Sequence, residues 1–497
     1  MSTRKRDIRL VAPLEFRLPP LTDAGGDVFE GTDSSTLTVA TYWDTEDLRL
    51  VRAGVTLHHA DDGWHLALPR PAGAVAVAPA TQRPQGDPGA PPAVATDLVT
   101  AFARGAPLDA IATLRTTQRR VPVYSASGTL IGAVVDEEIE VVDGERTTPR
   151  VRELGIESQL GMTRQQRAAL LARLRSAGTE PMDPVSPIVR VLGERAGTPS
   201  DVDSHPVVGG GQIAETLSRA LGEATRVLIA NDPGTRLGDD PEAVHQMRVA
   251  TRKIRSHLRT FLKLVDEAWA IGLREELQWL GGLLGEVRDA EVLLERLDQH
   301  VGRIPTADRD FAEQLLAELR AHLADARDAL LDGMRTDRYV ALLDQLVSAA
   351  QRPRLLLRID DHDDAEVLRE LVRGPVRSLR DAVASLPDQP PDESLHDVRI
   401  HAKRARYATE AVEPMFGKRA RAFAQALVDV QDVLGEHQDA VIAADWLRDA
   451  AVKTDDERVG FAAGQLAAIE HTAALAARKR WATAWNAADK KKLRAWL

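Results

Sequence analysis

The sequence predicts a multidomain α+β protein in which a β-rich half precedes an all-helical half. Residues 1–193 carry short runs of β-branched and aromatic residues, divided by turn signals such as Asp61-Asp62-Gly63. Residues 212–497 instead place apolar residues at helical spacing. Related motifs recur within this second half at offsets of 150 and 151 residues. An offset this constant indicates a duplicated domain.

The first half is expected to form an antiparallel sheet. Helices are expected at Asp97–Arg104 and Arg164–Ser176, and the Pro/Gly/Ala-rich stretch from Pro69 to Val94 predicts a long mobile loop. Residues 194–211 combine Pro, Ser, Asp and three glycines, which is typical of a flexible linker. The runs predicted to be strands are Thr36–Tyr42, Gly54–His58, Trp64–Leu68, Val121–Tyr124, Leu130–Val135 and Glu137–Val142.

The helical half is expected to hold two repeats, over about 212–350 and 364–488. A first helix, Gln212–Asn231, should end at the Asn-Asp-Pro-Gly sequence of Asn231–Gly234, and Asp239-Asp240-Pro241 should start the second helix. The remaining helices are expected at Ala268–His300, Ala307–Met334, Leu342–Ala350, Asp364–Ala384, His396–Phe416, Arg419–Asp449 and Asp456–Ala488.

The helix containing His245–Lys263 separates its residues into a cationic face and an apolar face. No Asp or Glu interrupts these nineteen residues. A solvated helix face is the alternative interpretation, but such faces usually mix charges, because like charges at i,i+4 repel. On a helical projection the cationic side chains fall within a stripe about 80° wide, and they are His245, Arg248, Arg252, Arg255, Arg259 and Lys263.

A second basic stripe follows in the second repeat, at His396–Tyr407. Aligned on the histidines, Arg248 matches Arg399 and Arg252 matches Lys403. Downstream, LGEVRDAEVLLERL (284–297) is echoed by LGEHQDAVIAADWL (434–447). Two self-repelling stripes predict an anionic partner that relieves the repulsion. The expected anion-binding residues are His245, Arg248, Arg252, Lys253, Arg255, Arg259, Lys263, Arg288, His396, Arg399, Lys403, Arg404 and Arg406.

These residues also carry a resemblance to a known family. The segment ANDPGTRLGDDPEAVHQMRVATRKIRSHLRTF (230–261) resembles the signature of the CHAD family, the conserved-histidine α-helical domain. The resemblance covers about residues 210–497. It implies two four-helix bundles related by a pseudo-twofold axis, and inorganic polyphosphate as the ligand. Both stripes could then bind one polymer from two sides.

The first half resembles the CYTH, or triphosphate-tunnel, family. The segments that carry the resemblance are ATYWDTEDLRLVRAGVTL (40–57), ARGAPLDAIATLRTTQRRV (103–121) and VRELGIESQLG (151–161). The resemblance implies an eight-stranded antiparallel tunnel in which active members use divalent cations to act on triphosphates.

Several residues of this chain depart from the CYTH pattern. Asp7 is the only acid where the family opens with Glu-x-Glu-x-Lys, and Ala67 replaces an expected lysine. Histidines stand at 58 and 59 where arginines are expected. Glu153 and Glu157 remain, but Gly155 and Gln159 occupy the neighbouring alternate positions. Because Mg²⁺ needs clustered oxygen ligands, we expect no catalysis in this half.

Two alternatives to a non-catalytic polyphosphate-binding protein stay open. Glu153, Glu157 and Arg49 favour a metal-dependent triphosphatase or polyphosphatase with an active CYTH half. The basic stripes could also bind nucleic acid, although a net charge of −11 and 4% aromatic residues disfavour this. In the CYTH-like half, arginines that could hold an anion, or simply be surface charges, are Arg49, Arg52, Arg115 and Arg119.

The sequence predicts no metal site and no cofactor. The histidines at 245, 396, 401 and 437 show no metal-ligand spacing that recurs in both repeats. The acids Glu286, Asp289, Glu436 and Asp439 are expected to orient basic side chains. With no cysteine, no apolar run near 18 residues and no apolar signal segment, we expect a cytoplasmic protein on polyphosphate granules.

Overall fold

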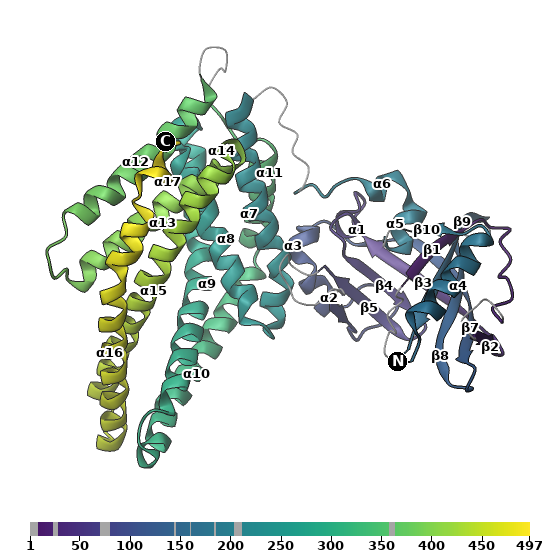
Figure 1. The fold of residues 1–497 in the computed structure, drawn as a ribbon, viewed down its shortest axis with the longest axis horizontal. Helices are drawn as coiled ribbons and strands as arrows, with labels where there is room; N and C mark the ends of the chain where they lie inside the picture. Colours follow the sequence, from purple (N-terminus) through teal and green to yellow (C-terminus); the bar gives the residue numbers. More distant parts are fainter. Residues whose placement is uncertain are drawn as a thin grey trace. The chain divides into compact units, whose positions relative to one another are not determined.

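The computed structural model describes residues 8–22, 28–69, 80–143, 146–159, 161–182, 185–202, 211–356 and 363–497. The chain divides into two compact units, Met1–Ser200 and Asp201–Leu497 (Figure 1). Three features predicted from the sequence lie wholly or partly outside the described residues: Asp7, positions 70–79 of the expected loop, and positions 203–210 of the expected linker.

The first unit is built on one antiparallel sheet, as predicted, which is consistent with a CYTH-like fold. Ten strands pair in the order β10-β1-β9-β8-β7-β3-β4-β5-β6, with β2 paired to β7. The resemblance implied eight strands; among the described residues, β2 and β10 add short segments of three and two residues to longer strands. The strands are β1 Ile8–Ala12, β2 Val28–Glu30, β3 Ser34–Asp44, β4 Thr56–Ala60, β5 Gly63–Leu68, β6 Ala80–Gln82, β7 Asp109–Ser125, β8 Leu130–Asp143, β9 Arg146–Ser158 and β10 Glu180–Pro181.

Two sequence predictions in this sheet are wrong. The separate strands expected at Leu130–Val135 and Glu137–Val142 form the single strand β8. Asp136 stays inside it because Arg152 of β9 donates to both of its carboxylate oxygens, at 2.9 and 2.8 Å. The loop expected from Pro69 to Val94 contains β6, which pairs with β5.

Helices cover parts of the sheet. Helix α4, Arg164–Ser176, has the predicted bounds and starts with a capping box in which Thr163 and Gln166 exchange hydrogen bonds. Its Leu170 and Leu174 pack into the core of the sheet. The helix expected at Asp97–Arg104 is two helices, because the chain leaves helical geometry at Val99, and part of the predicted linker is helix α6. The short helices are α1 Arg49–Arg52, α2 Ala93–Leu98, α3 Thr100–Ala103, α5 Pro187–Leu192 and α6 Glu194–Gly197.

The second unit is helical and contains two copies of one arrangement of four long helices (Figure 1). Helix α8 starts 151 residues before α13, and α9 starts 151 residues before α15, which confirms the repeat. Copy one contains α7 Gly211–Leu237, α8 Pro241–Thr260, α9 Glu267–Val301 and α10 Arg309–Met334, followed by α11 Asp337–Gln351. Copy two contains α12 Asp364–Ala384, α13 Asp392–Ala411, α15 Lys418–Lys453 and α16 Glu457–Ala488, with short α14 Glu413–Phe416 and α17 Lys491–Arg494.

Helix α7 does not end at Asn231–Gly234, contrary to the prediction. It continues to Leu237 with Pro233 inside it. The buried carboxylate of Asp232 accepts from the Nε of Arg236 one turn later, at 2.7 Å, and from the hydroxyl of Tyr339 at 2.6 Å. These contacts stabilise the turn that proline would otherwise interrupt. The helix ends instead at Gly238, whose φ is +77°.

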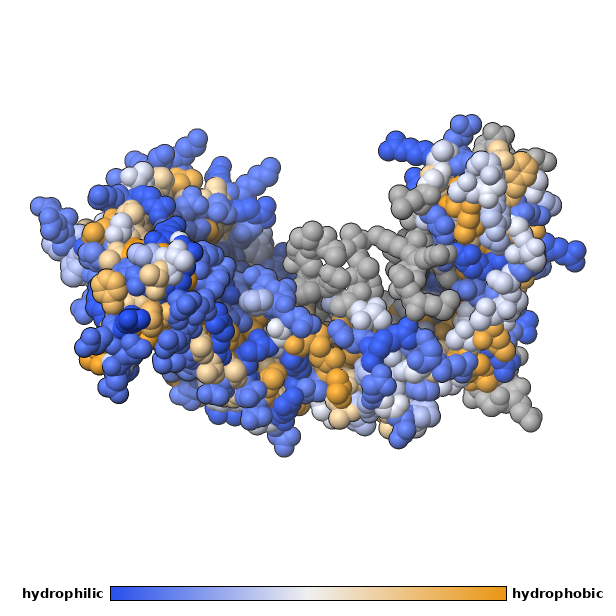
Figure 2. Space-filling model, turned by 90° about the horizontal axis from the view of Figure 1, so that it is seen from below, coloured by the Kyte–Doolittle hydropathy of each residue, from blue (hydrophilic) through white to orange (hydrophobic). Residues whose placement is uncertain are grey.

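The two copies share a core. Apolar residues of α9 and α10, such as Leu297 and Leu316, pack with residues of α15 and α16, such as Leu447 and Leu466. Fully buried Glu470 of α16 reaches copy one. No helix of the described chain is long and apolar enough to cross a membrane. On the face shown in Figure 2, hydrophilic residues cover most of the helical unit.

Candidate anion-binding site

Helix α8 forms because its start is capped and one of its faces is apolar. The side chain of Asp240 accepts from the backbone N–H of Glu242 at 2.9 Å, and Pro241 occupies the first turn. The apolar face is buried, as predicted. Lys263 lies beyond the end of the helix, in a short 3-10 turn at Leu262–Leu264, so it does not extend the α-helical stripe.

The stripe residues are less exposed than the sequence suggested. Because Arg252 and Lys403 belong to the basic stripes, opposite the apolar faces, their sequence positions predict exposure, but both are half-buried. The reason is that α8 and α13, the equivalent helices of the two copies, pack against each other. Each helix therefore covers part of the other's basic face.

This packing brings four cations together, and we call Arg248, Arg252, Arg399 and Lys403 the cation cluster. Burial, followed by the charges of Arg399, Arg252 and Arg248, lowers the pKa of Lys403 to about 7. The pKa of Arg252 is lowered first by burial and then by Arg248 and Arg399. Burial also lowers the pKa of Arg399, with Arg248 contributing. The cluster is thus electrostatically unfavourable in the free protein.

Two members of the cluster form no direct ion pair. Within the described chain, Arg252 and Arg399 form no ion pair, and the Nε atom of each is buried without a hydrogen-bond acceptor. Buried guanidinium groups without an acceptor cost free energy. An anion entering the cluster would supply the missing acceptors.

Acidic residues border the cluster on both sides. Arg248 donates to both carboxylate oxygens of Asp289, at 2.7 and 3.3 Å, so Asp289 orients this arginine as predicted. Burial raises the pKa of the equivalent Asp439, and nearby Arg399 opposes the shift. Glu436 pairs with Arg480 instead, and Glu286 is exposed.

The glycine of the repeated Leu-Gly-Glu motif lies beside the cluster in both copies. A Cβ atom at Gly285 would lie 3.9 Å from Nη2 of Arg248, and one at Gly435 would lie 3.7 Å from Nη2 of Arg399. Each glycine therefore lies against the arginine of its own copy. Both distances are ordinary van der Waals contacts, so a methyl group would also fit at either position.

A second group of cations lies farther along the two helices. Burial and then Arg259 lower the pKa of Arg404. Burial, Arg404 and Arg259 lower the pKa of His401. Arg255 donates to Oε1 of Gln278 at 3.0 Å. These residues extend the positive charge of the cluster.

Other predicted site residues already have protein partners. The Nζ of Lys253 lies 3.3 Å from Glu410, which also pairs with Arg406 at 3.3 Å. Glu410 was missed by the sequence analysis, although it follows Lys403 by seven residues and so shares its helix face. Arg288 pairs with Glu291 at 3.2 Å.

His245 and His396, which occupy equivalent positions in the two copies, have related surroundings. His245 lies near Arg288, whose charge and the effect of burial lower its pKa. In copy two the Nδ1 of His396 lies 2.9 Å from Oε1 of Gln438, the residue that matches Arg288. His437 instead faces Asp392, at 3.0 Å. No group of three or more His, Asp or Glu side chains suited to a metal was found among the described residues.

In the first unit, the candidate acids are paired with arginines. Glu157 lies 2.8 Å from Arg120, and Glu153 lies 3.1 Å from Arg190. The arginines considered for anion binding also have partners: Arg49 pairs with Asp47, Arg52 donates to the carbonyl of Pro199, Arg115 lies 3.9 Å from Glu140, and Arg119 pairs with Asp33.

Comparison with known proteins finds a family model that matches much of the helical unit and a relative that matches most of the chain. The family model described as the CHAD domain matches residues 219–448. An uncharacterized protein of Mycobacterium tuberculosis, found in two strains, is 30% identical over 442 residues, which cover 83% of this chain and 82% of the relative.

Solved structures are also similar. PptA from Streptomyces chartreusis is 27% identical, over 55% of this chain and 98% of PptA, with a TM-score of 0.46. The CHAD domain from the plant Ricinus communis is 28% identical, over 58% of this chain and 93% of that domain, with a TM-score of 0.42. From its family match and its relatives of similar length, the chain belongs to the CHAD-domain family.

Proposed function

We propose that this protein binds inorganic polyphosphate through the cation cluster of α8 and α13. The observation that carries the proposal is that equivalent helices of two copies bring four cations together, two of them with a buried Nε that has no hydrogen-bond acceptor. The known ligand class of the CHAD family agrees with this chemistry.

The geometry of a basic helix suits a condensed phosphate chain. Successive helical turns lie about 5 Å apart, a pitch comparable to the repeat of the polymer. Guanidinium groups bind phosphate oxygens through two parallel hydrogen bonds, and lysine adds a compact charge. Since both copies contribute, one chain would be bound from two sides. We also propose, from the ligand, that the protein resides in the cytoplasm on polyphosphate granules.

The binding proposal is tested with Arg252→Gln and Lys403→Gln, singly and combined. The matched control is Lys453→Gln/Lys479→Gln, which removes the same charge from exposed positions. Loss of each charged contact is expected to weaken long-chain polyphosphate binding by about 10- to 150-fold, since such contacts contribute about 1.5–3 kcal/mol. The combined variant should bind less tightly than either single variant.

Calorimetric titration at two salt concentrations measures the effect. Affinity should fall steeply with salt, because bound cations release counterions from the polymer. Wild-type affinity in the combined variant contradicts the proposal. Duplex DNA that competes as well as polyphosphate would favour nucleic acid as the ligand.

We propose further that the CYTH-like half is not catalytic. Arg120 and Arg190 pair with the two acids, Glu157 and Glu153, that a catalytic metal would need. Phosphate release from tripolyphosphate and from long polyphosphate, with Mg²⁺ or Mn²⁺, should not exceed the rate without protein. Turnover that Glu157→Ala abolishes would instead establish the triphosphatase alternative.

A further inference from the structure

The start of the third long helix differs between the two copies. In copy one the carboxylate of Asp266 accepts from the backbone N–H of Trp269 at 2.9 Å and caps α9, and Glu267 follows in the first turn. In copy two, 151 residues later, Gly417 precedes α15 and no side chain caps the helix. Lys418 and Arg419 replace the acid of the first turn. Copy two thus has no carboxylate where copy one has two.

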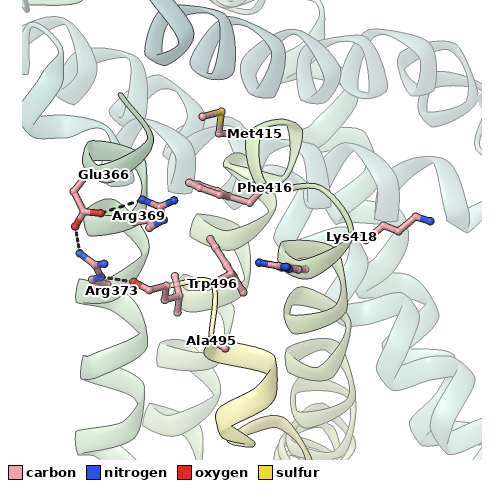
Figure 3. Close-up of a pocket in the computed structure, with 10 residues that line it drawn as sticks. Glu366, Arg369, Arg373, Met415, Phe416, Lys418, Ala495 and Trp496 are labelled. Carbon is pink, nitrogen blue, oxygen red and sulfur yellow. Dashed lines mark hydrogen bonds and ion pairs between the residues drawn. The ribbon is translucent and has the colours of Figure 1, made fainter. Parts of the chain in front are cut away.

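A cavity of about 680 Å³ lies beside this uncapped helix start (Figure 3). Four cations line it, Arg369 and Arg373 from α12 and Lys418 and Arg419 from α15. The acceptors that face them are the carboxylate of Glu366 and an oxygen of Leu497, which accepts from Nε of Arg373 at 2.6 Å (Figure 3). The N-terminus of a 36-residue helix adds partial positive charge. The cavity therefore has a positive surplus that favours an anion.

The contacts within the cavity leave donors available. Glu366 accepts from Arg369 at 3.1 Å and also from Arg373, which holds both arginines in place. Arg373 also donates to Leu497 and to Glu370, so the available donors are those of Lys418 and Arg419. Lys418 and Arg419 are exposed and form no ion pair within the described chain. Trp496 also lines the cavity, and its side chain is only 7% exposed. Its indole N–H is buried and has no acceptor. A bound oxyanion would provide one.

The aromatic rings of the cavity favour a compact anion over a nucleotide. The guanidinium of Arg369 lies 5.1 Å from the centre of the Phe416 ring, and the Trp496 ring lies 4.9 Å from it. Since these contacts already occupy the Phe416 ring, it offers no platform for a nucleobase. A compact oxyanion fits the remaining donors better than a nucleotide does.

We propose that this cavity is a second anion site, separate from the cation cluster, that takes one phosphate group. The group would occupy the position that the Asp266 carboxylate has in copy one, at the start of α15 beside Lys418, Arg419 and Trp496. It could arrive as inorganic phosphate or as the terminal phosphate of a polyphosphate chain. Only the second source rests on the proposed function.

The test uses the full chain carrying Arg252→Gln and Lys403→Gln, so that the cation cluster contributes little binding. Inorganic phosphate is titrated and followed by calorimetry. Adding Lys418→Gln/Arg419→Gln should weaken phosphate binding about tenfold or more. The control Lys491→Gln/Lys492→Gln removes two exposed lysines that do not line the cavity and should bind like the background. Trp496→Phe keeps the ring but removes the N–H, and should weaken binding several-fold.

Polyphosphate with free ends, and with both ends esterified, distinguishes the two sources. If the cavity takes a chain end, Lys418→Gln/Arg419→Gln weakens binding of free-ended chains and not of end-blocked chains. If the cavity takes free phosphate, Lys418→Gln/Arg419→Gln weakens binding of inorganic phosphate and changes neither polyphosphate titration. The proposal is overturned if Lys418→Gln/Arg419→Gln changes neither. The background already lacks two charges of the cation cluster. That outcome would therefore not count against polyphosphate binding by the cluster, which the Arg252→Gln and Lys403→Gln titrations test separately.

Discussion

The ammonium group of Lys253 on α8 lies 3.3 Å from the carboxylate of Glu410 on α13, so an acid of copy two neutralises a cation of copy one. The same carboxylate pairs with Arg406. Glu410 therefore withholds two cations from an anion bound at the neighbouring cluster.

Glu410→Gln is accordingly expected to increase polyphosphate affinity several-fold, because it frees Lys253 and Arg406 while keeping the shape of the side chain. Calorimetric titration with a chain of defined length measures the change. The control Glu313→Gln removes the same charge from a carboxylate that pairs with Arg320 in α10 and should have less effect. Unchanged affinity in Glu410→Gln would show that these cations do not contact the polymer.

Asp289→Asn is expected to increase the affinity for short polyphosphate chains more than the affinity for long ones. Asp289 accepts from both terminal nitrogens of Arg248, Nη1 and Nη2, and a short anion with few contacts has the least free energy with which to displace it. Affinity for tripolyphosphate should rise by a larger factor than affinity for long polyphosphate. Glu286→Gln, at an exposed neighbouring position, is the control. Equal gains for both ligands would argue against displacement of Asp289.

Binding is expected to weaken between pH 6 and pH 9. The pKa of Lys403 lies at about 7 in the free protein, so this side chain is charged at pH 6 and largely neutral at pH 9. An anion favours the charged form, and binding above pH 7 therefore requires uptake of a proton. Lys403→Arg should bind with a smaller pH dependence, and it corrects for titration of the polymer's own end groups. Parallel pH profiles for the two proteins would contradict this assignment.

The lowered pKa of Lys403 also predicts that the free protein becomes more stable as pH rises, whereas binding weakens. Below about pH 7 Lys403 is protonated in both states, and the native state bears the full cost of the buried charge. Between pH 7 and the ordinary lysine pKa of about 10.4, the unfolded state binds more protons, so the free energy of unfolding rises with pH. Urea unfolding should show Lys403→Gln to be more stable than wild type at pH 6.5, with a smaller difference at pH 9.

Glu470→Gln is expected to destabilise the helical unit by about 3 kcal/mol, as breaking a buried ion pair typically does. The carboxylate of Glu470 is fully buried, 2.6 Å from Nε of Arg296 and 2.7 Å from Nδ1 of His300 across the boundary between copies. Chemical denaturation measures the loss. The exposed control Asp455→Asn should change stability by less than about 0.5 kcal/mol. A similar small change in Glu470→Gln would show that the pair is not essential.

Local patterns predicted most of the helical unit, because helix starts and apolar periodicity are encoded within a few residues. The repeat offset and the start of α8 at Pro241 were correct for this reason. The continuation of α7 through Pro233 was missed, since it depends on Tyr339, about a hundred residues away. In the sheet, Asp136 looked like an interruption because its partner Arg152 lies on another strand.

The cationic residues were also predicted from the sequence, but their environment was not. Helical projection separates Arg252 from the apolar face and cannot show that α13 covers it. Contact between the two copies buries Arg252 and Arg399 and leaves the Nε atom of each without an acceptor. The shift in the pKa of Lys403 has the same origin. These properties depend on tertiary packing of residues about 150 positions apart.

Contact between the equivalent helices α8 and α13 has a consequence for the ancestry of this unit. When a helix of one copy packs against the equivalent helix of the other, a twofold axis relates the two copies. Each copy then carries only two of the four cations of the cluster. A single-repeat precursor could have assembled all four cations only by forming a symmetric homodimer. Gene fusion would then have joined the two subunits into one chain. After fusion, sequences could diverge independently, as the replacement of Arg288 by Gln438 and of Asp266 by Gly417 illustrates.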